Sequence, residues 1–328
     1  MNAHGVLRDG RVKLNNNNNG NSSKYGNSGF KEGEGKRKSS RLTFGTHRQK
    51  YQPVSTGHEG VPRMNIAILI TGSRGDVQPF IALGQTLQSA PYYHRVRIGT
   101  HGKFRDFVRG NGLEFFSIGG DPEQLMSYMV KNPGILPSVE SFRAGDVGAR
   151  KTELEEMLGG AWRACTEPLD TFDLAERLGQ SKDRSDSLNP LAPFVADAII
   201  SNPPTYASAH IAERLSIPLH MMFTMPWSPT RAFPHPLAQM DYGREDHGTA
   251  NYYSYSRMEL LTWTGLADIV NRFRRSLLLD GVDPSWGYNI IDRLKVPYTY
   301  CWSEALIPKP ADWGDSIGVS KPEGISHI

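Results

Sequence analysis

The chain has 328 residues, of which 38% are hydrophobic and 22% charged, a composition typical of a globular protein with one large or two modest domains. This composition excludes collagen-like, fibrous and wholly disordered chains. The first 60 residues hold 11 basic and 4 acidic side chains and the rest holds 26 and 30, so the formal net charge of +3 comes from the N-terminal segment. A mildly acidic body is not the charge pattern of a nucleic-acid-binding protein, and no nucleic-acid partner is expected.

Cysteine usage and apolar runs bear on where the protein works. Only Cys165 and Cys301 occur, too few and too far apart for a disulfide framework or a thiolate metal site. The longest apolar runs fall well short of the roughly 18 residues that cross a bilayer, and the N-terminus lacks the continuous apolar core of a secretory signal. We therefore predict a cytoplasmic protein, either free or peripheral to membranes.

Residues 1–62 have the composition of a disordered, low-complexity basic tail. An asparagine run fills positions 15–19, and glycine, serine and lysine supply much of the rest. Such a segment buries too little apolar surface to offset its chain entropy. The basic stretch at 36–38 with Arg41 could instead contact anionic lipid or act as an import signal. A solvated tail is the favoured interpretation, and residues 63–328 are expected to form the folded domain.

Within the folded part, short apolar runs alternate with amphipathic stretches. The expected strands lie near 64–70, 96–100, 113–118, 197–201, 218–224, 298–302 and 317–319. The expected helices lie around 80–87 and over 102–112, 152–167, 205–215, 257–279 and 285–295. Irregular chain is expected over 121–148, 178–190 and 225–236. The alternation predicts an α/β fold, a Rossmann-like parallel sheet with helices on both faces.

The loop Gly72-Ser73-Arg74-Gly75-Asp76 follows the first strand and precedes its helix. Because open parallel sheets bind ligands at the carboxyl ends of their strands, this position makes the loop the first candidate site. The glycines permit close approach to a phosphate, the helix N-terminus offers N–H groups, and Arg74 adds positive charge. The spacing is neither G-x-G-x-x-G nor G-x-x-x-x-G-K-[ST], so a dinucleotide or P-loop site is not indicated.

Several polar residues admit two interpretations. Asp76 could accept a proton from a bound hydroxyl or cap the following helix, and the residues alone favour capping. Ser73 could contact ligand or satisfy the turn. His210 lies alone in a predicted helix, where histidine is more often structural than catalytic. No Asp-x-Asp triplet occurs, so metal dependence is not expected.

An aromatic and methionine-rich tract extends from about 221 to 263, and most of it must be core. Its proline-broken portion, MPWSPTRAFPHP at 225–236, fits a loop better than a helix or strand. Loops with large apolar side chains often line sites for apolar ligands. The tract therefore predicts a hydrophobic acceptor or ligand.

Three blocks of sequence carry a resemblance to a known family. They are ILITGSRGDVQPFIALGQ at 68–85, SAHIAERLSIPLHMMFTMPWSPTRAFPHP at 208–236, and YCWS at 300–303 with PKPADWG at 308–314. Together they resemble the N-terminal half of fungal sterol 3-beta-glucosyltransferases, in glycosyltransferase family 28. The resemblance implies the GT-B architecture, in which two Rossmann-like halves face each other across a cleft and the N-terminal half binds the acceptor.

The resemblance also implies roles for residues. Asp76 matches the family's catalytic aspartate, which reverses the preference for capping: it would deprotonate the 3-hydroxyl of a sterol while that oxygen attacks UDP-glucose, with inversion to a β-glucoside. The loop expected to contact the donor phosphates and sugar comprises Gly72, Ser73, Arg74 and Gly75. The residues expected to line the acceptor pocket are His210, Phe223, Met225, Trp227, Phe233 and His235. Neither a metal nor a cofactor besides the UDP-glucose donor is implied.

The sequence departs from the family pattern near its end. No His-Gly pair is followed by a second glycine, as in the donor-binding half, and SKPEGISHI at 320–328 differs from the expected continuation. We therefore expect this chain to lack the donor-binding half. A separate donor-binding partner, or self-association through the cleft face, is the corresponding expectation.

Two other function classes compete. A non-catalytic sterol- or lipid-binding module fits the same departure and the aromatic tract. A nicotinamide-dependent oxidoreductase shares the fold class but fails on the glycine spacing.

Overall fold

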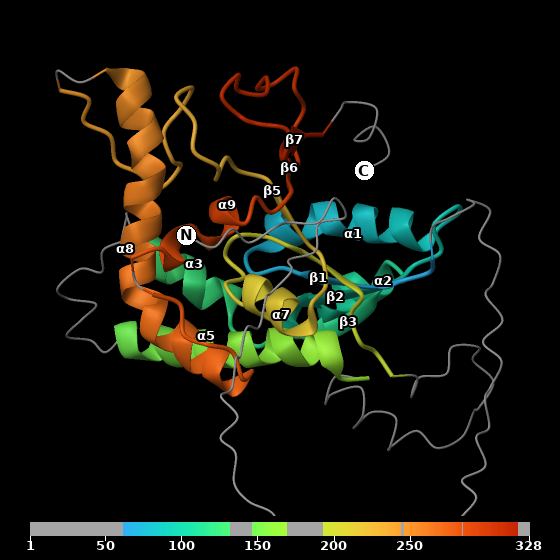
Figure 1. Cartoon of the computed structure of the whole chain (residues 1–328). Helices are drawn as coiled ribbons and strands as arrows, with labels where there is room; N and C mark the ends of the chain where they lie inside the picture. Colours follow the sequence, from blue (N-terminus) through green and yellow to red (C-terminus); the bar gives the residue numbers. More distant parts are fainter. Residues whose placement is uncertain (1–61, 132–145, 169–192, 244–245, 284, 321–328) are drawn as a thin grey trace, which may run out of the picture. The chain divides into compact units, whose positions relative to one another are not determined.

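The computed structural model describes residues 62–131, 146–168, 193–243, 246–283 and 285–320 (Figure 1). The predicted tail at 1–62 lies outside the described residues except for its last position. The polar stretch at 178–190 and the half of the irregular stretch at 132–145 also lie outside them.

A single parallel sheet organises the described residues. Its strands pair in the order β3-β2-β1-β4-β5-β6-β7, and every pair is parallel. The strands are β1 Asn65–Leu69, β2 Arg95–Thr100, β3 Glu114–Ser117, β4 Ala198–Ser201, β5 Leu219–Phe223, β6 Tyr298–Tyr300 and β7 Ile317–Val319. The order grows outward from β1 in both directions, so the topology reverses between β1 and β4, where folds of this kind bind ligands.

Helices cover both faces of the sheet, as predicted. On one face lie α1 (Arg74–Gln88) and α2 (Arg105–Gly110), and on the other α5 (Asp146–Thr166), α7 (Ser208–Leu215) and α8 (His247–Ser276). Figure 1 shows α1 on the opposite side of the strands from α5 and α7. The shorter elements are η1 (Gly102–Phe104), α3 (Pro122–Lys131), η2 (Gly287–Asn289) and α9 (Ile290–Arg293).

The alternation of side chains along β1 explains the two-sided core. Ile66 and Ile68 pack with the α1 and α2 side, whereas Ala67 and Leu69 pack with the α5 and α7 side. Successive side chains of a strand point to opposite faces, so a strand buried on both faces must be apolar throughout. A third buried cluster joins β5, β6 and β7 to the loops that follow them.

Three predicted segments differ from the structure. α3 occupies part of the stretch predicted to be irregular, and its first residue, Pro122, suits the first turn of a helix because that N–H needs no helical partner. α8 begins at His247 rather than near 257, because the Asp246 carboxylate accepts the Thr249 N–H at 2.8 Å and caps it. The predicted helix at 285–295 consists of only η2 and α9.

No described helix is both long and apolar enough to cross a membrane.

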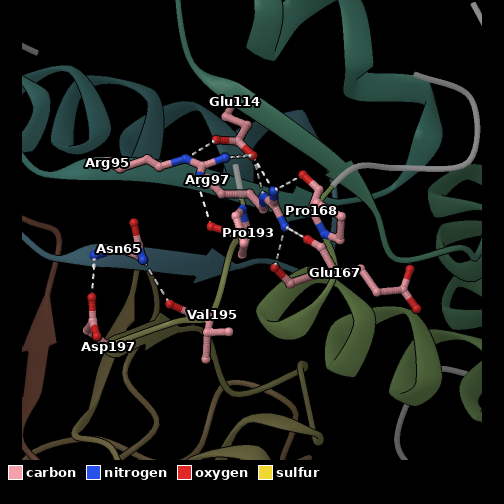
Figure 2. A network of polar contacts seen from close by, with 10 residues as sticks. Asn65, Arg95, Arg97, Glu114, Glu167, Pro168, Pro193, Val195 and Asp197 are labelled. Carbon is pink, nitrogen blue, oxygen red and sulfur yellow. Dashed lines mark hydrogen bonds and ion pairs between the residues drawn. The ribbon is translucent and has the colours of Figure 1, made fainter. Parts of the chain in front are cut away.

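Buried charge is paired at the amino ends of the strands (Figure 2). Arg97 of β2 is 1% exposed, and its Nε donates to the Glu114 carboxylate at 2.8 Å. Its other nitrogens donate to Glu114 again and to the backbone carbonyls of Ala164, Glu167 and Pro168. The cationic group lies 3.7 Å from the Phe194 ring centroid. We call this region, with Asn65, Arg95 and 193–197, the amino edge.

Candidate functional site

The loops that follow β1 and β4 are tied together at the topological reversal. Asn202 is fully buried, and its side chain bonds both backbone groups of Thr71, accepting from the N–H at 3.2 Å and donating to the carbonyl at 2.8 Å. The Thr205 hydroxyl lies 2.7 Å from Asn202 Oδ1 and 3.0 Å from Thr71 Oγ1. These contacts fix the path of the chain into the glycine loop. We call residues 71–76 and 202–205, with His101, the carboxyl edge.

Asp76 lies in the first turn of α1, and its carboxylate is oriented by Ser73. Oδ2 accepts the Ser73 N–H at 2.7 Å and the Ser73 hydroxyl at 3.0 Å. This is the capping interaction that the residues alone favoured. Both hydrogen bonds fall on Oδ2, and among the described residues Oδ1 has no such partner. The arrangement is compatible with capping and with proton acceptance through Oδ1.

Gly72 is required by both conformation and space. Its φ is +143°, a value that side-chain-bearing residues rarely adopt, and a Cβ there would lie 2.4 Å from Asp76 Oδ2. The other loop residues are more open: Arg74 is exposed and its guanidinium lies 4.6 Å from the Phe107 ring centroid, while Gly75 is exposed in the first turn of α1. The close packing of Gly72 on Asp76 keeps this part of the loop compact.

His101, which was not among the residues selected from the sequence, supports the loop from the end of β2. Its Nε2 accepts the Gly72 N–H at 3.1 Å, and its Nδ1 lies 2.9 Å from the Gly119 carbonyl oxygen. Acceptance at Nε2 places the proton on Nδ1, which donates to Gly119. Burial lowers the pKa of His101 and so favours this neutral form. A histidine directly after a buried strand was the available sequence signal.

Behind this edge lies a cavity of about 110 Å³, which we call the α8 cavity. Its walls come from the residues after β4, the loop after β5, α7, α8 and η2 with α9. Three of the predicted acceptor residues, His210, Trp227 and His235, line it.

The other three predicted acceptor residues lie elsewhere. Phe223 is buried at the end of β5 with its ring centroid 5.4 Å from that of Trp227. Phe233 packs edge-on against Trp313. Met225 is 38% exposed. The structure thus gathers half of the predicted pocket residues around one cavity.

The two cavity histidines are held neutral. Arg274 is buried and donates through Nη1 to His210 Nδ1 at 2.9 Å while it pairs with Glu213. Burial, and then the positive charge of Arg274, lower the pKa of His210 to about 3. The Leu237 N–H donates to His235 Nδ1 at 3.1 Å, and burial lowers the pKa of His235 to about 4. Both rings therefore carry their proton on Nε2, and neither is suited to act as a base near neutral pH.

Two carboxyl groups also line the cavity, the half-buried Glu259 and the more exposed Asp292, and neither was selected from the sequence. Glu259 of α8 accepts the Trp227 indole N–H at 2.9 Å. Burial, with the nearby charge of Asp292, raises the pKa of Glu259 to about 7. An isolated acid among apolar helical residues, Met258 and Leu260, was the signal for Glu259.

Metal binding was not expected from the sequence. Across the described ranges, no three His, Cys, Asp or Glu side chains form a group suited to a metal ion.

Comparison with known proteins supports the motif resemblance. Residues 66–158 match the profile of the glycosyltransferase family 28 N-terminal domain. The sterol 3-beta-glucosyltransferases UGT80A2 and UGT80B1 of Arabidopsis thaliana are 41% and 38% identical over 267 and 270 residues. A sterol 3-beta-glucosyltransferase of the fungus Yarrowia lipolytica is 35% identical over 258 residues. The resemblance to the N-terminal half of such enzymes is confirmed.

These relatives are considerably longer than the chain. The three alignments cover 79%, 81% and 79% of this chain but 36%, 38% and 15% of the relatives. Among solved structures, CalG4, the calicheamicin glycosyltransferase, is similar with a TM-score of 0.42 and 14% identity over 79% of this chain and 53% of that one. Similarity at this level does not establish a function.

Proposed function

Because the chain carries a glycosyltransferase family 28 N-terminal domain at residues 66–158, we propose that it supplies the acceptor-binding half and the base of a UDP-glucose:sterol glucosyltransferase. The observation that carries the proposal is the carboxylate of Asp76. It lies at the carboxyl edge, where the sheet topology reverses, and Ser73 holds its Oδ2 with two hydrogen bonds. The names of the relatives supply the acceptor and sugar of the proposal.

In the proposed reaction, Asp76 removes the proton of the sterol 3-hydroxyl as that oxygen attacks the anomeric carbon of glucose. The new C–O bond forms on the face opposite the leaving group, so the configuration inverts. The bond between the anomeric carbon and the phosphate oxygen breaks, and its electron pair leaves with UDP. The protonated Asp76 then releases its proton to solvent. Asp76 thus contributes general base catalysis, typically worth about 10²–10⁴ in rate.

The glycine loop is the proposed contact for the donor phosphates. Its backbone runs into the N-terminus of α1, where the helix dipole favours negative charge. The Arg74 guanidinium is exposed beside this terminus. These groups would stabilise the charge that develops on the departing diphosphate. A donor-binding half, in a partner or in a longer form of the protein, would complete the site.

The test is formation of steryl glucoside from UDP-glucose and a sterol. The chain is assayed together with a separately expressed C-terminal half of the Arabidopsis relative UGT80A2, and the anomeric form of the product is read by NMR. The proposal predicts a β-glucoside and a loss of about 10²–10⁴ in rate for Asp76→Asn, because asparagine keeps the shape but cannot accept the proton. Asp106→Asn, an exposed acid on α2, serves as the matched control and should retain activity.

A second candidate function is sterol binding without transfer. It is favoured by the same hydrogen bonds, since Ser73 and Asp76 complete a helix cap without any reaction. Saturable sterol binding with no steryl glucoside from any pairing would support this candidate. Equal activity of wild type and Asp76→Asn would contradict the proposed role of Asp76.

A further inference from the structure

Unpaired polar atoms gather in the α8 cavity. The side-chain atoms His235 Nε2, Trp263 Nε1, Asn289 Oδ1 and Tyr298 Oη are buried without a hydrogen-bond partner in the described part of the chain. All four residues line the cavity, and the Tyr298 hydroxyl can both donate and accept. Leaving a buried polar atom unpaired costs about 1–3 kcal/mol, so natural proteins rarely collect several at one place without a ligand or water.

The donors in this group are fixed by their neighbours. His235 receives the Leu237 N–H on Nδ1, so its Nε2 carries a proton and can only donate. Trp263 has only an N–H to offer. His210 lines the same cavity, and Arg274 occupies its Nδ1 in the same way, which leaves its Nε2–H as a further donor.

The acceptors lie on α8 and on the segment formed by η2 and α9. Glu259 uses one oxygen for the Trp227 N–H, and Asn289 Oδ1 is unpaired. Asp292 is the second carboxyl group in the wall. A protonated carboxyl group can also donate, so Glu259 is able to serve either role as its pKa rises with burial.

These walls select a chemical class. A keto or ether oxygen would satisfy the donors but not Asn289, and an ammonium group would satisfy the acceptors but not His235 or Trp263. A hydroxyl both accepts and donates. The volume of about 110 Å³ is below the roughly 300–1,000 Å³ of a pocket that encloses a whole ligand, so the cavity holds part of a larger molecule.

We propose that the α8 cavity receives a second hydroxyl of the acceptor, distinct from the one that is glucosylated, and that Glu259, His235 and Trp263 select acceptors that carry it. This inference rests on the proposed function for its sterol framework. It makes the preferred acceptor a sterol with an additional hydroxyl rather than one with a plain hydrocarbon body. An ordered water that fills the cavity is the alternative occupant.

The test compares two probes on the full chain. Cholesterol and cholesterol hydroxylated on its side chain are titrated separately, and binding is followed through the fluorescence of tryptophan, since Trp227 and Trp263 line the cavity. We expect the hydroxylated sterol to bind at least about tenfold more tightly, because a site built to bond a hydroxyl rejects the analogue that lacks it.

Variants show which residues cause the preference for the hydroxylated sterol over cholesterol. Glu259→Leu should reduce this ratio of affinities to below about threefold. Glu259→Gln should retain it, because glutamine can still accept from Trp227 and donate to the ligand. His235→Phe tests the opposite wall and should also weaken it. Asp268→Asn, an exposed acid on the same helix, is the matched control and should leave the ratio unchanged. Circular dichroism and thermal unfolding confirm that each variant is folded.

The outcomes separate this inference from the proposed function. Equal affinity for the two sterols, as expected if water fills the cavity, would overturn the second-hydroxyl site while leaving sterol glucosylation intact. Failure of both sterols to bind would overturn the sterol acceptor itself, and the inference with it. A preference that persists unchanged in both Glu259→Leu and His235→Phe would show that another part of the chain reads the hydroxyl.

Discussion

The two ends of the parallel sheet treat buried polar groups in opposite ways. At the amino edge, Arg97 is fully buried and all of its nitrogens have partners on Glu114 or on backbone carbonyls (Figure 2). Behind the carboxyl edge, the α8 cavity collects atoms that have none, such as Trp263 Nε1 and His235 Nε2. The same strands run between the two edges. We therefore assign the difference to function, with a structural role for the amino edge and ligand binding for the carboxyl edge.

A buried charge with all of its hydrogen bonds made holds elements together. A cavity lined by polar atoms without hydrogen-bond partners instead favours the binding of a ligand or water. Arg97 of β2 binds Glu114 of β3 and the end of α5, which lies 67 residues further along the chain. Nothing else is needed to complete that cluster. The polar atoms of the α8 cavity can be completed only by a molecule from outside the described chain, whether solvent or substrate.

The largest effect is expected from substitution of Arg97 at the amino edge. Arg97→Met removes the charge that pairs with Glu114 and leaves three carbonyl oxygens without their donor, so we expect a loss of about 3–5 kcal/mol in the free energy of unfolding. Urea unfolding measures it. Arg95→Met is the control, because Arg95 also pairs with Glu114 but is partly exposed and should cost below about 1 kcal/mol. Equal losses of stability in Arg97→Met and Arg95→Met would contradict the structural role assigned to the buried Arg97.

Glu259, which lines the α8 cavity, is expected to make the stability of the protein depend on pH. Its folded pKa of about 7 lies above the ordinary 4.5, so between these values the folded state binds a proton that the unfolded state lacks, and stability falls as pH rises. Glu259→Gln removes this penalty while keeping a partner for Trp227. We expect the variant to be more stable than wild type by about 3 kcal/mol at pH 8, with the difference vanishing near pH 4.5.

The two cavity histidines affect the pH dependence of the free energy of unfolding in the opposite sense to Glu259. Their lowered pKa values, about 3 for His210 and about 4 for His235, make stability rise with pH up to the ordinary 6.5. Wild type and Glu259→Gln both contain these histidines. Their contribution therefore cancels in the difference between the two free energies of unfolding at each pH. A difference that stays constant from pH 4.5 to 8 would contradict a raised pKa for Glu259.

Gly72 gives the smallest expected effect. Gly72→Ala would place a methyl group 2.4 Å from Asp76 Oδ2 at a φ of +143°, and we expect a loss of about 1–2 kcal/mol in thermal or urea unfolding. Gly75→Ala is the matched control. Its Cβ would meet only Ser73 Oγ at 3.6 Å inside α1, where alanine favours the helix, so it should be neutral or stabilising. The same sign for both variants would remove the special role assigned to Gly72.

The sequence predicted the sheet and the position of the glycine loop because these depend on local patterns. The apolar run of β1 and the turn after it are readable within a few residues, and topology then assigns that turn to the ligand-binding end. The start of α8 was missed because its first turns carry polar and aromatic residues, and the capping signal at Asp246 stands alone.

The polar part of the site was harder to predict because it assembles across long sequence separations. Asn202 meets Thr71 131 residues away, and Glu259 meets Trp227 32 residues away. Neither pair has a fixed spacing or a motif. His210 and His235 were selected as pocket residues, but their neutral state depends on Arg274 and on the Leu237 backbone, which only the folded chain brings close.

Hydrogen exchange measured with and without a side-chain-hydroxylated sterol tests most directly whether the two ends differ in purpose. We predict slower exchange on binding in 71–76, 203–210, 225–236 and 255–263, with no change in 95–97 and 193–197. Protection at the amino edge, or none at either edge under saturating sterol, would contradict the assignment of ligand binding to the carboxyl side of the sheet.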